Sequence, residues 1–292
     1  MKKWFKEPPK HSFDDVSGME ELKKTLRKCA DSYHETLRKY LNLPNMQSYL
    51  FVGPPGCGKT YIIEAFAHEL MEKDYKYISV VASDILSKLV GESEKKVQRL
   101  FEEAEKNAPC IVFIDEIDAL CKNRSGDVPE YTKSLTTSFL TGYNMLKNSR
   151  DKDIVFISAT NYPNNIDDAM IDRIQLIEVP LPDEEARESA FRRVFQSIMK
   201  LKEDIDFSYM AKQSNNYNYR DIERLNNSLK KKLVEEITEV QGMTDEEGIE
   251  ALKNGQICLT KELFDKIQGE FIPTPKDNIL REIEAWKNRM NQ

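Results

Sequence analysis

Residues 53–60 have the composition and spacing of a phosphate-binding loop. Their sequence, Gly-Pro-Pro-Gly-Cys-Gly-Lys-Thr, fits the pattern G-x-x-x-x-G-K-[ST]. The glycines allow consecutive backbone N–H groups to turn toward phosphate oxygens, and the following helix directs the positive end of its dipole at them. Lys59 is expected to reach the outer phosphates and Thr60 to coordinate Mg²⁺. We expect nucleotide contacts from Pro55, Gly56, Cys57, Gly58, Lys59, Thr60 and Tyr61.

Two carboxylates follow directly after an apolar run further along the chain. Residues 110–114 are apolar on both faces, as in a buried parallel strand, and Asp115 and Glu116 come next. Ligands of open α/β sheets bind beyond the carboxyl ends of the strands, so Asp115 is expected to hold Mg²⁺ through water. Glu116 is expected to orient and polarise the attacking water. A surface turn is the alternative for such a pair, and the phosphate-binding loop favours the catalytic interpretation.

A polar residue also follows a third apolar run. Residues 154–159 are apolar or small, and Thr160 and Asn161 come after them. The Asn161 side chain is expected to hydrogen-bond the outer phosphate or the attacking water. An asparagine that only caps the strand is the alternative.

Apolar runs that alternate with helical patterns position these residues. Strands are predicted over 49–52, 77–81, 110–114, 154–159 and 174–179, and helices over 59–73 and 132–147. A further helix is predicted with Ser93 as its N-cap and with Val97, Leu100, Phe101 and Ala104 on one face. This alternation predicts an α/β fold, a parallel sheet sandwiched by helices. A strand before the loop and a helix after it disfavour a glycine-rich turn without a ligand.

The pattern divides the chain into three parts. Residues 1–12 form a predicted N-terminal tail, in which Trp4 and Phe5 either dock a partner or fold back onto the rest of the protein. Residues 13–182 are the predicted nucleotide-binding domain. After residues 180–182 (Pro-Leu-Pro) the pattern turns helical, and residues 183–292 are predicted to form a small helical lid with a C-terminal helix that carries Trp286. Within this part, residues 235–256 are predicted to be loop and turn.

The composition limits the class of protein. The 292 residues carry a net charge of −7, which argues against binding duplex nucleic acid through overall electrostatics. No apolar run approaches the ~20 residues of a membrane span, and no signal peptide is recognisable. The five cysteines are scattered without a C-x-x-C pair, which predicts reduced thiols and a cytoplasmic location.

Taken together, the motifs resemble those of AAA ATPases over about residues 12 to 290. The matching stretches are 13–19, 53–60, 87–94, 114–120, 159–161, 180–183 and 273–275 with the amphipathic helix after it. The chain is most similar to the branch that holds katanin, spastin and the ATPase that disassembles ESCRT-III filaments, as a single AAA module without an N-terminal adaptor domain. The resemblance implies ATP and Mg²⁺ as ligands, and a hexamer of this chain that forms on ATP binding and remodels a protein substrate.

The resemblance also implies roles for individual residues. The segment through Gly18 is expected to pass near adenine. Family members commonly have two adjacent arginines that complete the site of a neighbouring subunit, whereas this chain has Asp172 and then Arg173. Arg173 is the candidate, and a surface pair with Asp172 is the alternative. Arg220 replaces a small residue of the family's motif, so it either contacts the γ-phosphate of its own site or lies in solvent at a helix start.

Residues 88–90 occupy the place of the loop that faces the central pore in relatives. Many relatives have an aromatic residue, a hydrophobic residue and then glycine there, whereas this chain has Lys88, Leu89 and Val90 before Gly91. We expect this loop to contact a threaded protein substrate, with Leu89 as the apolar contact. Packing of Leu89 at a helix end is the alternative.

Three functions remain open from the sequence. The favoured one is a motor that hydrolyses Mg·ATP and unfolds or disassembles protein substrates. These substrates are recruited either directly or by a separate adaptor. A nucleotide-gated scaffold with weak turnover is the second, because Asp172 replaces a family arginine. A nucleic-acid-associated ring is the third, and the acidic charge disfavours it.

Overall fold

A five-stranded parallel sheet forms the centre of the computed structural model, which describes residues 4–31, 40, 46–89, 91–124, 128–149, 152–274 and 276–290. The strands are β1 (Met46–Val52), β2 (Lys76–Val81), β3 (Cys110–Asp115), β4 (Ile154–Thr160) and β5 (Gln175–Glu178), in the spatial order β2-β3-β4-β1-β5. All neighbouring strands pair in parallel, so their carboxyl ends lie at one edge of the sheet. This edge carries the candidate site.

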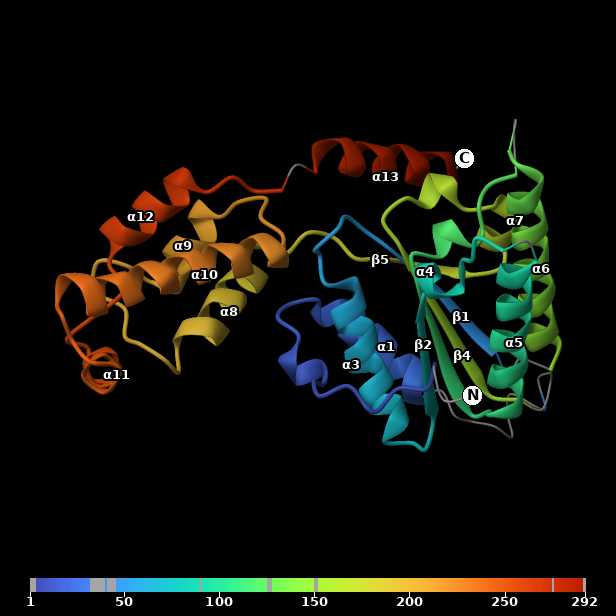
Figure 1. Cartoon of the computed structure of the whole chain (residues 1–292), viewed down its shortest axis with the longest axis horizontal. Coiled ribbons are helices and arrows are strands. Elements are labelled where there is room, and N and C mark those ends of the chain that lie inside the picture. The colour runs from blue at the N-terminus through green and yellow to red at the C-terminus, as the bar shows by residue number, and fades with distance from the viewer. Residues whose placement is uncertain are drawn as a thin grey trace.

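Helices cover both faces of the sheet (Figure 1). Helices α1 (Glu20–Asp31) and α3 (Lys59–Met71) lie on one face, and α5 (Glu92–Lys106) and α6 (Glu130–Asn148) lie on the other. Successive side chains of a strand point to opposite faces. In β3, Val112 and Ile114 therefore join the core under α5 and α6, whereas Ile111 and Phe113 join the core under α1 and α3. The predicted α/β fold is confirmed.

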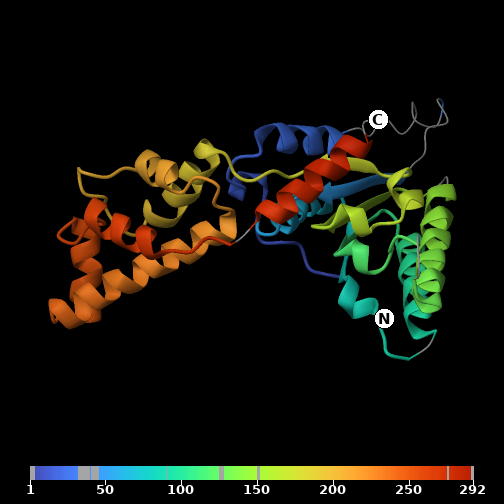
Figure 2. The same cartoon turned by 90° about the horizontal axis from the view of Figure 1, so that it is seen from above.

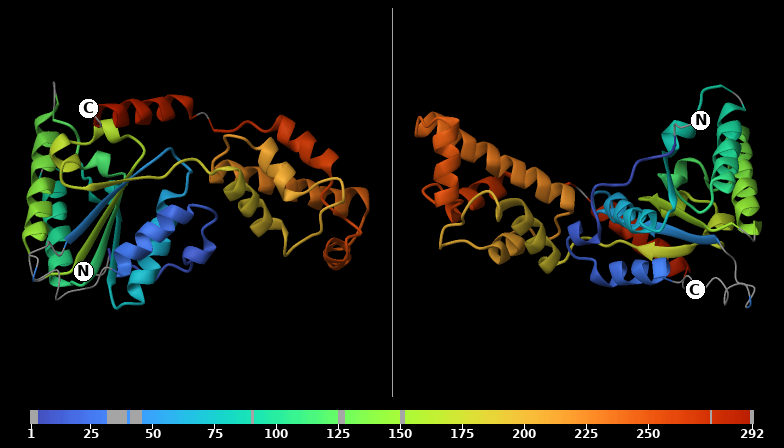
Figure 3. Two further views of the ribbon diagram at one scale, coloured as in Figure 1. Left: turned by 180° about the vertical axis from the view of Figure 1, so that it is seen from behind. Right: turned by 90° about the horizontal axis from the view of Figure 1, so that it is seen from below.

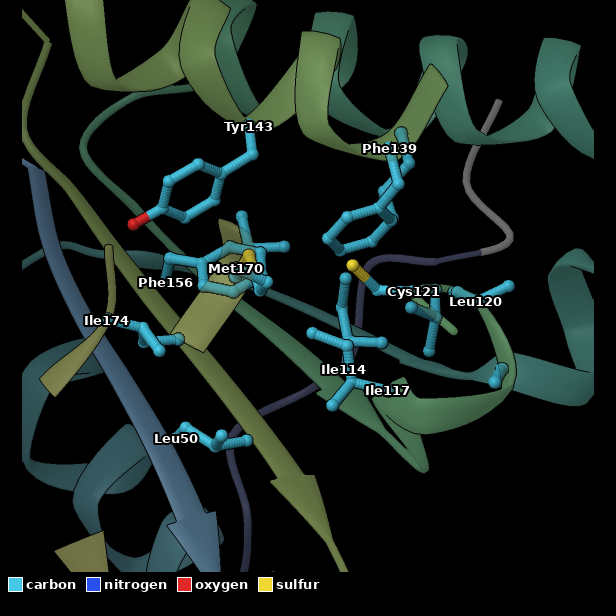
Figure 4. Close-up of a cluster of buried hydrophobic side chains, with 14 of the residues drawn as sticks. Leu50, Ile114, Ile117, Leu120, Cys121, Phe139, Tyr143, Phe156, Met170 and Ile174 are labelled. Carbon is cyan, nitrogen blue, oxygen red and sulfur yellow. The ribbon is translucent and has the colours of Figure 1, made fainter. Parts of the chain in front are cut away.

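Aromatic side chains fill the core between the sheet and the α5–α6 layer (Figure 4). Phe156 of β4 meets Tyr143 of α6 edge to face, with ring centroids 5.3 Å apart, and Phe139 at 6.4 Å. The Tyr143 hydroxyl lies 2.9 Å from Ser48 Oγ and 3.0 Å from the Arg173 carbonyl oxygen. This buried hydroxyl therefore ties α6 to β1 and to the chain segment that enters β5.

The start of α5 differs from the prediction for Ser93. The helix begins at Glu92, and its N-cap is Gly91 with φ of 77°, a left-handed conformation that suits glycine. Ser93 lies inside the first turn and is buried, and its Oγ accepts a hydrogen bond from the Ser87 amide at 2.9 Å. The N-cap prediction is wrong because the Ser93 hydroxyl holds the preceding loop instead of capping its own helix.

The segment 235–256 is also more regular than predicted. It contains a π-helical turn, η4 (Glu236–Val240), and helix α11 (Asp245–Asn254). Thr244 caps α11 by accepting from the Glu247 amide, and the Glu247 carboxylate accepts from the Thr244 amide in return. This capping box, with Gly255 after the last turn, outweighs the loop-forming composition of the segment.

The helices after the sheet form a second layer of packing with its own core. They are α8 (Glu184–Phe195), α9 (Phe207–Gln213), α10 (Tyr219–Glu235), η4, α11 and α12 (Lys261–Glu270). Their buried side chains, including Phe191, Leu229 and Phe264, form one cluster that is separate from the two cores of the sheet. The division of the chain after residues 12 and 182 stays a prediction.

The last helix, α13 (Asp277–Met290), returns to the α/β part of the protein. Figures 1 and 2 show it extending from α12 back over the sheet. Its Ile283 and Trp286 belong to the core on the α5–α6 side, and Lys287 pairs with Glu178 of β5 at 2.5 Å. The helix therefore bridges the lid and the sheet, although it follows the lid in sequence.

Residues 4–6 of the predicted N-terminal tail lie along the outer strand β2. Phe5 forms an antiparallel bridge with Ile78, the Ser79 amide donates to the Trp4 carbonyl at 3.0 Å, and the Lys6 amide donates to the Tyr77 carbonyl at 2.9 Å. Trp4 and Phe5 also pack against the core on the α5–α6 side. Of the two predicted roles for these side chains, folding back onto the protein is the one observed.

The remaining elements in the described ranges are short. They are η1 (Phe13–Asp15), α4 (Ala82–Ile85), η2 (Ile117–Ala119), η3 (Pro163–Asn165) and α7 (Asp168–Ile171). The view from behind in Figure 3 shows the α/β part and the lid as two lobes joined by the chain after β5 and by α13.

Candidate nucleotide site

The loop between β1 and α3 has the backbone of a phosphate cradle. Gly56 and Gly58 have φ values of 74° and 92°, which residues other than glycine rarely adopt. A Cβ atom on Gly56 would also lie 2.9 Å from the Asn218 side chain. Gly58 is the N-cap of α3 and no side chain caps the helix, so the N–H groups of its first turn are available to an anion.

Lys59 supplies a buried positive charge to this cradle. Its Nζ donates to the carbonyl oxygens of Gly53 (2.8 Å) and Pro54 (3.0 Å), and to Oδ1 of Asn161 (2.5 Å). Burial lowers the pKa of the Lys59 ammonium from its ordinary value, because desolvation disfavours the charged form. A phosphate beside Nζ would offset that penalty, so the residues present fit an anionic phosphate chain.

Two oxygen donors lie next to the cradle. Thr60 Oγ1 donates to Asp115 Oδ2 at 3.2 Å. Mg²⁺ prefers oxygen ligands and keeps several from phosphate and water, so this pair fits a magnesium ion bound together with a nucleotide. No group of three or more His, Cys, Asp or Glu side chains that could hold a metal occurs in the described ranges.

Glu116 follows Asp115 in a left-handed backbone conformation, with φ of 56° and ψ of 43°. This conformation is uncommon for a residue other than glycine, and such outliers cluster at functional sites. It turns the chain sharply after β3, and the Glu116 side chain is exposed at the rim of the site. Asn161, after the neighbouring strand β4, bonds directly to Lys59. The carboxyl ends of β3 and β4 thus place both predicted catalytic groups beside the cradle.

A pocket of about 800 Å³ extends from the cradle toward the lid. One end contains the phosphate-loop residues with Asp115, Glu116 and Asn161. The other end lies between the segment 15–19 and helices α8 and α10. Gly18 does not line the pocket, although its neighbours Ser17 and Met19 do. A Cβ atom on Gly18 would lie 2.5 Å from the Ala186 Cβ, so Gly18 permits α8 to approach behind this wall.

Tyr61 and Cys57 differ in their access to the pocket. Tyr61 lines it, and its ring stacks on His11 with centroids 4.0 Å apart. The N-terminal tail therefore reaches the wall of the site. Cys57 is fully buried, and burial raises the pKa of its thiol, so Cys57 is an unreactive part of the loop.

The N-terminus of α10 bonds directly to the phosphate-binding loop, which the sequence analysis missed. Asn218 Nδ2 donates to the Pro55 carbonyl oxygen at 3.0 Å, and the Tyr219 amide donates to the Gly56 carbonyl oxygen at 3.0 Å. The Tyr219 hydroxyl donates to the Ser17 carbonyl oxygen at 2.5 Å. We call these three bonds the lid latch. The spacing Asn218-x-x-Asp221 before an apolar stripe is a helix-start signal that could have indicated it.

Asp221 holds the lid latch in place from within the protein. Its amide and carboxylate form a capping box with Asn218, and the carboxylate also accepts from Lys276 Nζ (2.6 Å) and from the Thr274 amide and hydroxyl (3.0 and 2.7 Å). Burial alone would raise the pKa of Asp221, but these hydrogen bonds outweigh it and hold the pKa below its ordinary value. Asp221 thereby joins the start of α10 to the segment that leads into α13.

Arg193 of α8 makes a second bridge from the lid, and sequence reasoning missed it as well. Its guanidinium donates to the Asp14 carbonyl oxygen (2.9 Å) and to Asp15 Oδ1 (3.3 Å). Arg193 also lines the pocket. No sequence signal singled out this arginine among the other charged residues of α8.

The other predicted residues lie in different places. Arg220 lines the pocket beside the cradle and is exposed, and its Cβ would lie 3.1 Å from a Cβ atom on Gly56. Arg173 is exposed after α7 and lies outside the pocket. The Arg173 guanidinium donates to the Ala169 carbonyl oxygen and makes no ion pair with Asp172 in the described part of the chain. Lys88 and Leu89 lie in the loop before α5, with Leu89 66% exposed, and Val90 lies outside the described residues.

Comparisons with known proteins agree with this architecture. Residues 49–181 match the family model described as "ATPase family associated with various cellular activities (AAA)". The structure is similar to the crystal structure of the FIGL-1 AAA domain in complex with ADP, with a TM-score of 0.77, 24% identity, and coverage of 98% of this chain and 93% of that one. The family match covers most of the sheet and the phosphate-binding loop, and the structural similarity shows that the chain has the fold of the FIGL-1 AAA domain.

Two curated relatives extend the similarity beyond the matched domain. The chain is 33% identical over 275 residues to the Cell division cycle protein 48 homolog of Archaeoglobus fulgidus, which covers 92% of this chain and 36% of that protein. It is 36% identical over 230 residues to an uncharacterized AAA domain-containing protein of Schizosaccharomyces pombe, covering 75% of this chain and 29% of that one. The chain thus spans about a third of the length of these relatives.

Replacing Asp221 tests its role as the anchor of the lid latch. Asp221→Asn leaves the buried Lys276 ammonium without its counter-charge, so we expect the free energy of unfolding at pH 7 to fall by about 3–5 kcal/mol. The pKa of Asp221 is lower in the folded protein than the ordinary value of 3.8 that applies to the unfolded chain. The extra stability of the wild type over Asp221→Asn is therefore complete above pH 3.8, and it declines as the pH falls through the folded pKa. Urea unfolding at several pH values measures both effects.

The matched control for this prediction is the exposed ion pair between Lys287 of α13 and Glu178 of β5. Lys287→Met removes the partner of Glu178, and both side chains are nearly half exposed, so the loss should stay within about 1 kcal/mol. Equal losses in the two variants, or an Asp221→Asn loss that does not shrink as the pH falls below 3.8, would contradict the anchoring role.

Proposed function

We propose that this protein binds Mg·ATP in the pocket and hydrolyses it. The proposal rests on one observation. The buried Lys59, the Thr60–Asp115 oxygen pair and the exposed Glu116 all lie at one end of the same pocket. The match of residues 49–181 to the AAA family supports ATP as the nucleotide. The motif stretches support a place in the katanin and spastin branch.

Each residue at the phosphate end has a separate role in the proposed reaction. The first turn of α3 and Lys59 bind the phosphate oxygens, and Thr60 and Asp115 hold the magnesium ion, which neutralises charge on the phosphates when bound. Glu116 accepts a hydrogen bond from the attacking water and orients it. Asn161 is released from Lys59 as the phosphates take its place, and then hydrogen-bonds the outer phosphate or the water. Arg220 lies beside this phosphate end, next to Gly56, and is the candidate for a contact with the γ-phosphate.

Substitutions at Glu116 and Lys59 separate hydrolysis from binding. Glu116→Gln should keep ATP affinity within about threefold and lower turnover at least about 100-fold, because only the group that orients the water is lost. Lys59→Ala should instead weaken ATP binding, because the charge facing the phosphates is removed. Calorimetric titration and phosphate release on both variants measure these effects. Near-normal turnover by Glu116→Gln would contradict the assignment of Glu116 as the group that orients the water. If the wild-type protein binds ATP but its turnover is negligible, the nucleotide-gated scaffold is favoured.

We also propose that the site is completed by a second copy of the chain in an ATP-dependent hexamer. Arg173 is exposed and lies outside its own pocket, so it is available to the pocket of a neighbour. The Tyr143 hydroxyl fixes the backbone at Arg173, and among the described residues the guanidinium is held only by the Ala169 carbonyl oxygen. A cation placed in this way can stabilise the charge that develops on the transferred phosphate.

The dependence of turnover on protein concentration tests this proposal. An arginine supplied by a neighbour can raise the rate roughly 10³-fold or more, so activity per subunit should rise with concentration. Arg173→Ala should abolish this rise and leave ATP affinity in the monomer unchanged. Turnover and sizing are measured over the same dilution series. Activity per subunit that stays constant while the assembly dissociates would contradict a contribution in trans.

The loop at Lys88, Leu89 and Val90 is the proposed contact with a threaded protein substrate. Leu89 is 66% exposed, which disfavours the alternative in which it packs in the core. Leu89→Ala should therefore keep the melting temperature and basal turnover while it lowers stimulation of turnover by an unfolded protein. A joint fall in melting temperature and basal turnover would remove this assignment. Recruitment through a separate adaptor remains part of the proposal, and the acidic charge continues to disfavour nucleic acid.

The proposed location is the cytoplasm. Cys29, Cys57, Cys110, Cys121 and Cys258 are all free thiols, which supports a reducing compartment. None of the helices in the described ranges is long and apolar enough to cross a membrane.

A further inference from the structure

Asn226 of α10 is a buried side chain whose hydrogen-bonding groups are unused. The residue is 2% exposed, and neither Oδ1 nor Nδ2 has a hydrogen-bond partner among the described residues. A buried amide without partners is unfavourable, so it usually has a partner that becomes available only with a ligand or water. The pocket is the place where such a partner can enter, because Asn226 is part of its wall.

The helix geometry places Asn226 on the face of α10 that lines the pocket. Residues three or four apart share one face of an α-helix. Apart from Arg220 in the first turn, the residues of α10 that line the pocket follow this spacing, and they are Tyr219, Ile222, Glu223, Asn226, Asn227 and Lys230. Asn226 therefore belongs to the same face that approaches the phosphate-binding loop at Tyr219.

Asn226 lies at the end of the pocket away from the phosphate site. It follows Arg220 by six residues, which corresponds to about 9 Å along the helix axis and is of the order of the length of a nucleoside. The surrounding wall comes from the segment 15–19 and from α8, which packs against α10. It combines apolar side chains, such as Val16, Ala190 and Val194, with the charged side chains of Arg193, Glu223 and Lys230. Apolar side chains beside an unused amide suit a flat heteroaromatic base with polar edge atoms.

We propose that the Asn226 carboxamide selects adenine over guanine in this pocket, an inference that rests on the proposed binding of a nucleotide. Asparagine can pair with adenine through two hydrogen bonds, in which Oδ1 accepts from the 6-amino group and Nδ2 donates to N7. Guanine presents two acceptors, O6 and N7, at the same edge, so Oδ1 would face another oxygen. The Asn226 amide, which has no hydrogen-bond partner among the described residues, would thus gain both partners only from the adenine base.

Binding of three diphosphates measures the selection without hydrolysis. The probes are ADP, GDP and purine riboside diphosphate, which lacks the 6-amino group, and calorimetry with the full chain gives each affinity. We expect the wild type to prefer ADP by about tenfold or more over both analogues. Asn226→Leu should reduce both preferences to within about threefold. The control Asn227→Leu changes the exposed neighbour that lines the same pocket, and should keep the wild-type preference.

The thermal stability of the variants separates base selection from a structural role. Asn226→Leu removes an amide without partners, so the melting temperature of the nucleotide-free protein should stay the same or rise, whereas the upward shift caused by ADP should shrink. Asn226→Ala serves as a second variant without added bulk. If the Asn226 variants bind ADP and keep the wild-type preference, the role of Asn226 is contradicted and the proposed function is not affected. Failure of the wild type to bind any of the three nucleotides would overturn the proposed function, and this inference with it.

Discussion

The buried carboxylate of Asp221 is the contact on which the arrangement of the lobes depends. It caps α10 together with Asn218, pairs with Lys276 and accepts two hydrogen bonds from Thr274. The first contact orients the lid latch toward the phosphate-binding loop, and the other two fix the segment that leads into α13. Since α13 then packs on the sheet through Trp286, the contacts of Asp221 join the lid to the α/β part at two places, in addition to the Arg193 bridge.

The phosphate end of the pocket contains the buried ammonium group of Lys59, whose charge the protein compensates incompletely. Burial lowers the pKa of Lys59, and its hydrogen bonds go to neutral acceptors in the loop and to Asn161. Phosphates would take over these contacts and release Asn161. The same loop offers the carbonyl oxygens of Pro55 and Gly56 to the lid latch. A change in the loop on nucleotide binding would therefore be transmitted to α10 directly, without an intervening element.

The sequence predicted the site where chemistry restricts residue type and spacing together. Few other residue types could replace the glycines, Lys59 and Thr60 of the cradle or the two acids at the end of β3. The structure brings these residues together. The prediction for Ser93 was wrong because a hydroxyl near a helix start can bond a neighbouring loop equally well. The prediction for 235–256 gave composition more weight than the capping box at Thr244. Asn226 could not be identified, because its lack of partners is a property of the packed structure and not of α10 alone.

Amide hydrogen exchange with and without Mg·ATP tests most directly whether the pocket binds nucleotide and is coupled to the lid. The Glu116→Gln protein keeps ATP bound during the measurement. The account predicts slower exchange in residues 53–62, in residues 218–222 at the lid latch, and in α13, because the contacts of Asp221 connect these segments. Slower exchange confined to the phosphate-binding loop would contradict the coupling, and unchanged exchange throughout would contradict nucleotide binding itself.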